Sequence, residues 1–206
     1  APAGHQALPL MQGDFSIKQL REGMHLHCTD LVHLQPLTTR SVLPGRCMKV
    51  LLKLEGNAQV RLGRQMLPLD AGCAGHACPK GAVVWLDGPE EFERCCNAGC
   101  RQRMVVVTLA PEWFASAQML EFFTPDPLVV RVWAPTPRAI AIAEQLLHPA
   151  VFEGPMHSLY LESRVLELVA EAFSQTILAN QGMPPGLRPN EYARACRLRG
   201  LLDSGQ

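Results

Sequence analysis

The fold of this chain is decided by the stretch Gly23-Met-His-Leu-His-Cys-Thr-Asp-Leu-Val-His-Leu34, in which apolar and polar residues alternate. One face carries Met24, Leu26, Cys28, Val32 and Leu34, and the opposite face carries His25, His27, Thr29 and His33. Successive side chains of a strand point to opposite faces, so this pattern predicts a half-buried strand whose apolar face points into the interior. Asp30 and Leu31 interrupt the alternation, which predicts a bulge or bend at that point.

Similar short runs continue after this strand. Residues 46–54 repeat the alternation, with Lys49 and Lys53 opposite Met48, Val50, Leu52 and Leu54. Turns that contain glycine separate the next runs, which is typical of β-hairpins. Further strands are expected at residues 58–62, 65–69, 82–86, 92–95 and 103–109. About seven short antiparallel strands of this kind predict a barrel or a sandwich.

From Pro111 onward the apolar residues recur at helical spacing. Helices are expected to begin at Pro111 and at Thr136-Pro137, and a long helix is expected around Ser158–Asn180. The long helix has two apolar strips, together wider than the stripe of about 100° that packs against one body. One strip is Leu159, Leu166, Phe173 and Ile177, and the other is Leu161, Val165, Leu168 and Ala172. We assign the second strip to a homodimer interface; the alternative is a helix sunk more deeply into one core.

Composition and charge exclude several classes of protein. The chain has 206 residues, 48% of them hydrophobic, and its 19 basic and 19 acidic residues cancel, whereas a nucleic-acid-binding domain usually has a basic excess. No segment approaches the roughly 18–20 apolar residues of a membrane span. Residues 1–13 lack the features of a secretion signal. These properties indicate a cytoplasmic protein whose eight cysteines are reduced thiols.

Two groups of residues have the chemistry of metal ligands. His25 and His27 lie two apart in a strand and therefore on one face, but this face is expected to point away from the interior. Cys73, His76 and Cys78 lie in a glycine-containing loop, and Cys95, Cys96 and Cys100 lie in another. Together these loops can supply a thiolate-rich site for a metal or haem, and Cys78-Pro79 resembles a haem-regulatory dipeptide. The alternative is that they are ordinary loop thiols.

The sequence contains no nucleophile motif and no phosphate-binding glycine loop. The groups best suited to holding a small anionic or aromatic ligand are Trp85, Arg94, Arg101 and Arg103. A guanidinium group pairs with a carboxylate or phenolate, and an indole supplies a flat apolar wall. The alternative is that Trp85 belongs to the core and the arginines are solvated.

Several short motifs resemble the amino-terminal effector domains of the AraC/XylS family of bacterial transcription regulators. They are Glu22-Gly-Met-His-Leu26, Val50-Leu-Leu-Lys-Leu-Glu-Gly56, Pro111-Glu-Trp-Phe114 and Leu159-Tyr-Leu-Glu-Ser-Arg-Val-Leu-Glu-Leu168. Within that family the pattern is most similar to regulators of siderophore (pyochelin-type) uptake. Residues 191–202 resemble the stretch that leads into the family's two helix-turn-helix units.

The resemblance implies an α+β fold, with an antiparallel cupin-like β-barrel followed by a helical dimerisation segment. Residues 1–14 are then a flexible lead-in, 15–110 the barrel, 111–181 the helical region, and 182–206 a linker and the start of a DNA-binding region absent from this chain. A small-molecule effector would bind in the barrel, and DNA would be contacted only through the absent region. We expect the effector-binding site to be lined by Met24, Leu26, Met48, Val50, Trp85, Arg94 and Arg103.

Two other functions compete with this non-enzymatic sensor. A cupin-type metalloenzyme would use His25, His27 or the group Cys73, His76 and Cys78 around a metal with an open coordination position. A direct metal, haem or thiol sensor would use the loops from Cys73 to Cys100 as its switch.

Overall fold

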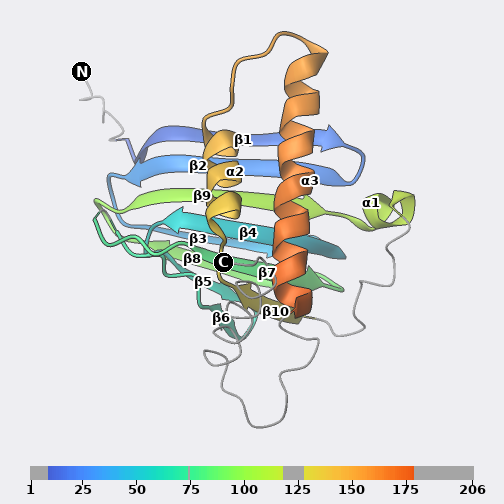
Figure 1. Ribbon diagram of the computed structural model, residues 1–206. Helices are drawn as coiled ribbons and strands as arrows, with labels where there is room; N and C mark the ends of the chain where they lie inside the picture. Colours follow the sequence, from blue (N-terminus) through green and yellow to red (C-terminus); the bar gives the residue numbers. More distant parts are fainter. Residues whose placement is uncertain (1–8, 74, 118–127, 179–206) are drawn as a thin grey trace, which may run out of the picture.

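Two antiparallel β-sheets form the body of the protein, which the computed structural model describes at residues 9–73, 75–117 and 128–178. In chain order the elements are β1 (Met11–Arg21), β2 (Met24–His33), β3 (Leu37–Leu43), β4 (Cys47–Glu55), β5 (Gln59–Leu62), β6 (Gln65–Leu67), β7 (Lys80–Leu86), β8 (Glu90–Cys96), β9 (Arg101–Leu109), α1 (Pro111–Ser116), β10 (Leu128–Trp133), α2 (Pro137–Leu147) and α3 (Pro155–Leu178). The larger sheet has the order β1-β2-β9-β4-β7-β10, and the smaller has the order β3-β8-β5-β6. Helices α2 and α3 lie across one face of the larger sheet (Figure 1).

The α+β class agrees with the sequence, but the described strands do not form a hydrogen-bonded closed barrel. Within the described ranges, each strand pairs only inside its own sheet. The sheets are instead held together by an apolar cluster that includes Leu51, Val84 and Val106 of the larger sheet and Leu62 and Leu67 of the smaller one. The larger sheet is therefore the middle layer, with helices on one face and the smaller sheet on the other.

Alternate residues along each strand of the larger sheet face opposite layers of the protein. On β4, Met48, Val50, Leu52 and Leu54 belong to the core beneath the helices, whereas Cys47 and Leu51 belong to the core between the sheets. The same division places Met24, Leu26 and Cys28 of β2 beneath the helices. The most apolar face of the strands thus packs against the helices rather than facing the interior between the sheets, which reverses the orientation expected from the sequence.

Strand β2 runs through Asp30 and Leu31 without the predicted bulge. Its pairing with β1 and with β9 keeps a constant register at both residues. The alternation breaks because Asp30, on the helix-facing side, is held in ion pairs with Arg101 and Arg103 of β9. Leu31 on the other side is buried. The irregular pattern therefore reflects a paired carboxylate, not a distortion of the backbone.

Three strands were not expected. Strand β1 begins at Met11, inside the range taken as a flexible lead-in, and most of its side chains are exposed because it lies at the sheet edge. Strand β3 is also largely exposed. Strand β10 interrupts the region expected to be helical and pairs with β7.

The expected helix beginning at Pro137 is confirmed, with the Thr136 side chain accepting a hydrogen bond from the Ala139 amide. Residues 179–206, including the expected final helix, lie outside the described residues.

The two apolar strips of α3 lie on opposite faces instead of adjoining each other, and the strip assigned to the dimer packs on the chain's own sheet, together with Phe173 of the other strip. Leu161, Val165, Leu168 and Ala172, assigned to a dimer interface, are at most 2% exposed and belong to the core beneath the helices. At 100° per residue the face opposite them carries Met156, Leu159 and Leu166, which are 58%, 59% and 38% exposed. The structure therefore corrects the assignment, because the chain's own sheet already covers the strip that was assigned to the dimer.

The two faces can be distinguished by the same substitution made two residues apart. Leu168→Ala should lower the free energy of unfolding by about 2–5 kcal/mol, because it leaves a cavity in the core. Leu166→Ala should change it by less than about 1 kcal/mol, because Leu166 is partly solvated. Urea denaturation measures both values, and equal losses would contradict the packing described for α3.

Candidate ligand-binding site

A cavity of about 380 Å³ lies between the two sheets. Its volume is within the range of roughly 300–1,000 Å³ typical of small-molecule sites. Most of its lining is apolar, contributed by Phe15, Ile17, Leu43, Leu51, Ala58, Val60, Leu62, Leu67, Leu69, Val84, Phe92, Met104 and Val106. The polar lining residues are Ser41 and Gln102, and the basic ones are His27, Lys49, Lys53 and Arg94. The cavity is therefore an apolar chamber with basic groups in its wall.

Two lysines of β4 reach this chamber because they share the strand face of Leu51. The ammonium group of Lys49 donates a hydrogen bond to Thr108 Oγ1 at 3.0 Å. Lys53 is 1% exposed, and its Nζ donates to the carbonyl oxygen of Ala58 at 3.3 Å. Burial lowers the pKa of each lysine, because a charged ammonium is poorly solvated there.

His27 stands in the same wall on β2. Its Nε2 lies 3.0 Å from Thr29 Oγ1, and the Phe15 ring packs edge-on against the imidazole at 4.7 Å. Burial first, and then the positive charges of Arg94 and Lys49, lower the pKa of His27 from 6.5 to about 4. The imidazole is therefore neutral at pH 7.

The lowered pKa of His27 predicts a pH-dependent stability. As the pH falls, the unfolded chain takes up this proton near 6.5 and the folded chain only near 4. The stability contributed by neutral His27 is therefore complete above about pH 6.5 and is lost between there and about pH 4. We expect this contribution to be up to about 3 kcal/mol. Urea denaturation across this range should show a shallower decline for His27→Gln, whereas parallel curves would assign the pH dependence to other groups.

Most of the predicted effector-binding residues lie on the other side of the larger sheet. Met24, Leu26, Met48, Val50 and Trp85 pack in the core beneath the helices. The guanidinium carbon of Arg131 lies 5.5 Å from the Trp85 ring centroid. Of the predicted residues, Arg94 lines the cavity.

Arg103 also lies on the helix side, where it ties three elements together. Its Nε donates to Asp30 Oδ2 on β2 at 3.2 Å, and its two terminal nitrogens donate to the carboxylate of Glu144 on α2 at 3.0 and 2.5 Å. These hydrogen bonds raise the pKa of Arg103, with Glu144 the largest cause. Arg103 therefore positions α2 on the sheet and does not face the cavity.

Arg101 provides a matched control for this role, since it also pairs with Asp30 but is 49% exposed, against 18% for Arg103. Arg103→Gln should cost about 1–3 kcal/mol of unfolding free energy, because it breaks a partly buried two-carboxylate pairing. Arg101→Gln should cost less than about 1 kcal/mol. Chemical denaturation tests the ranking, and a larger loss for Arg101→Gln would contradict it.

The structure does not gather the predicted metal ligands into a site. Cys73, His76 and Cys78 are exposed in the loop before β7, and the described residues contain no cluster of three or more His, Cys, Asp or Glu side chains suited to a metal. Burial raises the pKa of the Cys73 thiol, and the Cys100 thiol of the other cysteine loop raises it further. Cys100 Sγ also lies 2.7 Å from Asn57 Oδ1 and accepts a hydrogen bond from Gln102.

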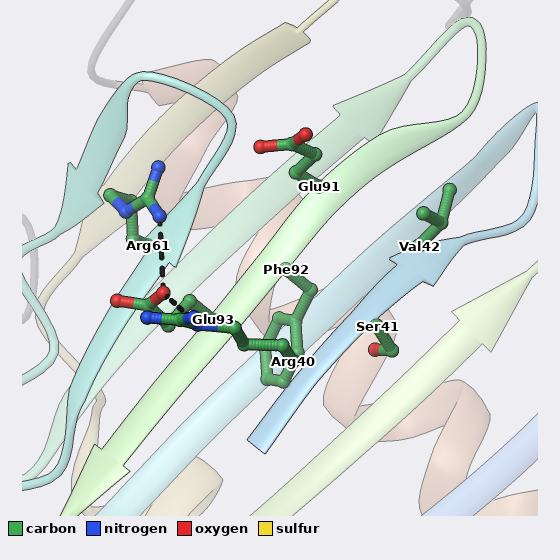
Figure 2. A pocket seen from close by; sticks show the side chains of 7 residues that line it. All are labelled: Arg40, Ser41, Val42, Arg61, Glu91, Phe92 and Glu93. Atoms are coloured by element: carbon green, nitrogen blue, oxygen red, sulfur yellow. Dashed lines mark hydrogen bonds and ion pairs between the residues drawn. The ribbon is translucent and has the colours of Figure 1, made fainter. Parts of the chain in front are cut away.

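A second depression lies on the outer face of the smaller sheet. In Figure 2 the side chains of Arg40 and Arg61 converge on the carboxylate of Glu93. Arg40 Nε and Arg61 Nη2 lie 2.6 and 3.2 Å from Glu93 Oε2. This hollow is larger, at about 570 Å³, but it opens widely to solvent and its cations are already neutralised. The cavity between the sheets is therefore the better candidate site.

Sequence reasoning missed His27, Lys49 and Lys53 as cavity residues. The available signal was in β4, where Lys53 stands between Leu52 and Leu54 in a run of apolar residues. A lysine inside a strand that is apolar on both faces is expected to be buried, and a buried lysine usually has a specific role. The histidines were assigned to the outside because the apolar face of β2 was assigned to the interior.

The fold and site define a sheet-based domain with a small-molecule cavity, and comparison with known proteins assigns its family. The model of the regulatory protein PchR N-terminal domain matches residues 12–188, and the chain belongs to this family. The match confirms the resemblance to the N-terminal domains of AraC-type regulators of the PchR type. No helix in the described part of the chain is long and apolar enough to cross a membrane.

Comparison with solved structures gives a similarity at low sequence identity. A solved structure of ToxT from Vibrio cholerae is 8% identical, with a TM-score of 0.33. The alignment covers 69% of this chain and 57% of that one, so the chain spans less than two thirds of the length of ToxT. No curated protein matches the chain.

Proposed function

We propose that this chain is the sensing domain of a cytoplasmic, non-enzymatic transcription regulator and binds its small-molecule effector between the two sheets. The observation that carries the proposal is the cavity of about 380 Å³, apolar over most of its wall and with basic groups converging on it. Membership in a family of regulatory N-terminal domains supports a sensing role over a catalytic one. The cavity replaces the cupin-like barrel interior as the place of the effector.

The strands that line the cavity also carry the helices, which gives binding a route to the rest of a regulator. Val106 of β9 lines the cavity, and its neighbours Val105 and Val107 pack beneath the helices. A ligand that favours one arrangement of β9 therefore also favours one arrangement of α2 and α3. Regulation requires that the effector binds the two arrangements with different affinity, because equal affinity shifts neither.

We further propose a homodimer formed through the exposed face of α3. Met156, Leu159 and Leu166 are large apolar side chains on one helical face and are open to solvent. Phe152, just before the helix, is 42% exposed and its ring contacts Tyr160 at 5.0 Å. A second copy of α3 would remove this surface from water. DNA would be contacted by a separate helix-turn-helix region.

Filling the cavity tests the proposed binding site. Val60 of β5 lines the cavity, whereas Val42 of β3 is 64% exposed in the hollow on the outer face. We would measure melting temperatures with benzoic, 2-naphthoic, 4-phenylbutanoic and octanoic acids and their primary amides. At ten times its dissociation constant, a binding compound should raise the melting temperature of the wild type and of Val42→Phe by roughly 3–6 °C. Val60→Phe should lose the response.

Either of two results would overturn the proposal: no compound stabilises the wild type, or Val60→Phe responds as the wild type does. In a regulator that also carries its DNA-binding region, a compound that passes this test should change the affinity for operator DNA. The DNA should change the affinity for the compound by the same factor, because coupling between two binding sites is reciprocal.

A further inference from the structure

The wall of the cavity carries positive charge without a matching carboxylate. Among the described residues that line it, the ionisable ones are His27, Lys49, Lys53 and Arg94. The chain as a whole has a formal net charge of zero, so this imbalance is local. Lys53 lies on the larger sheet and Arg94 on the smaller one, so both walls contribute a cation.

Two of these cations have hydrogen-bonding capacity left over. An ammonium group has three N–H donors. Lys53 is only 1% exposed, and in the described part of the chain its Nζ makes one hydrogen bond, to the Ala58 carbonyl at 3.3 Å. Arg94 Nε is buried and has no hydrogen-bond partner among the described residues. Buried cationic donors without acceptors are costly, so they favour an acceptor that arrives with a ligand.

Lys53 and Arg94 line the same cavity. Burial is the largest cause of the lowered pKa of Lys53, His27 and the fully buried His33, and the positive charge of Arg94 lowers each of these pKa values further. Opposing influences on Lys53 come from Cys100, Asp70 and Cys96, which are not among the lining residues. An anion placed between Lys53 and Arg94 would relieve the repulsion that the ligand-free cavity contains.

We propose that Lys53 and Arg94 form an anion-binding subsite that accepts the carboxylate of a small, otherwise apolar molecule. This inference rests on the proposed function and names the chemical class of the effector. The carboxylate accepts hydrogen bonds from Lys53 Nζ and Arg94 Nε, and the apolar body lies against Leu51, Val84 and Val106.

Other ligand classes fit the wall less well. A cation would face basic groups without a lining carboxylate. A sugar or other neutral polyol needs many paired donors and acceptors, and the uncharged polar side chains in the lining are Ser41 and Gln102. A strongly hydrated dianion such as inorganic phosphate would lose its water against a wall that is mostly apolar. A monoanion with an apolar body matches both parts of the lining.

The test compares each acid of the panel with its neutral amide, which has nearly the same shape. Isothermal titration calorimetry at pH 7 should show that the wild type prefers at least one acid over its amide by about tenfold or more, as expected for charge-assisted hydrogen bonds. Lys53→Met and Arg94→Gln should each reduce this preference to about threefold or less, because the acid loses more affinity than its amide when a charged donor is removed. Lys18→Met is the matched lysine control, because Lys18 lies outside the cavity, and should retain the wild-type preference.

The outcomes separate the inference from the function on which it rests. If amides bind but the wild type prefers no acid, the anion subsite is overturned and the cavity remains a binding site. If neither acids nor amides bind, both are overturned. An acid preference that survives both Lys53→Met and Arg94→Gln also overturns the assignment. Lys53→Met should fold, because an apolar chain of similar length replaces a desolvated charge, and its melting temperature without ligand should not fall.

Discussion

Burial of both faces of the larger sheet is the constraint on which the rest of this structure depends. A sheet packed on two sides must have apolar residues at both parities of its central strands, and β4, β7 and β9 meet this condition. On the helix side, Leu161, Val165 and Leu168 of α3 pack against the strands. The other side is covered by a smaller sheet that leaves a cavity. The larger space for a ligand is therefore between the two sheets.

Burial of the cavity's basic groups is costly, because the protein supplies few groups that compensate their charge. Glu93 pairs with the arginines on the outer face of the smaller sheet, and Asp30 and Glu144 pair with Arg103 on the helix side. These three carboxylates therefore pair with arginines outside the cavity. His27 adapts by remaining neutral, as its lowered pKa requires. The result is a cavity wall with a local excess of basic groups.

Much of the fold could be predicted from the sequence, because alternation, turn residues and proline positions are local signals. The central strands, the helix that begins at Pro137 and the two-sided character of α3 are all visible in the residue pattern. The sequence could not show which face of each strand packs against the helices and which faces the smaller sheet. Alternation separates the side chains of a strand into two faces but does not say what covers each face. This ambiguity misplaced Met24 and Trp85 in the binding site and left out Lys53. The edge strands β1 and β3 were missed because exposed strands have little apolar periodicity.

The alternation along the central strands also separates two kinds of sequence change. Leu51, Val84 and Val106 line the cavity, and each has immediate neighbours that pack beneath the helices. A substitution at a cavity position alters the shape of the binding site. The adjacent residue, which packs against the helices, is left unchanged. Ligand preference and helix packing can therefore diverge independently among related proteins, one strand position at a time, without a rebuilt fold.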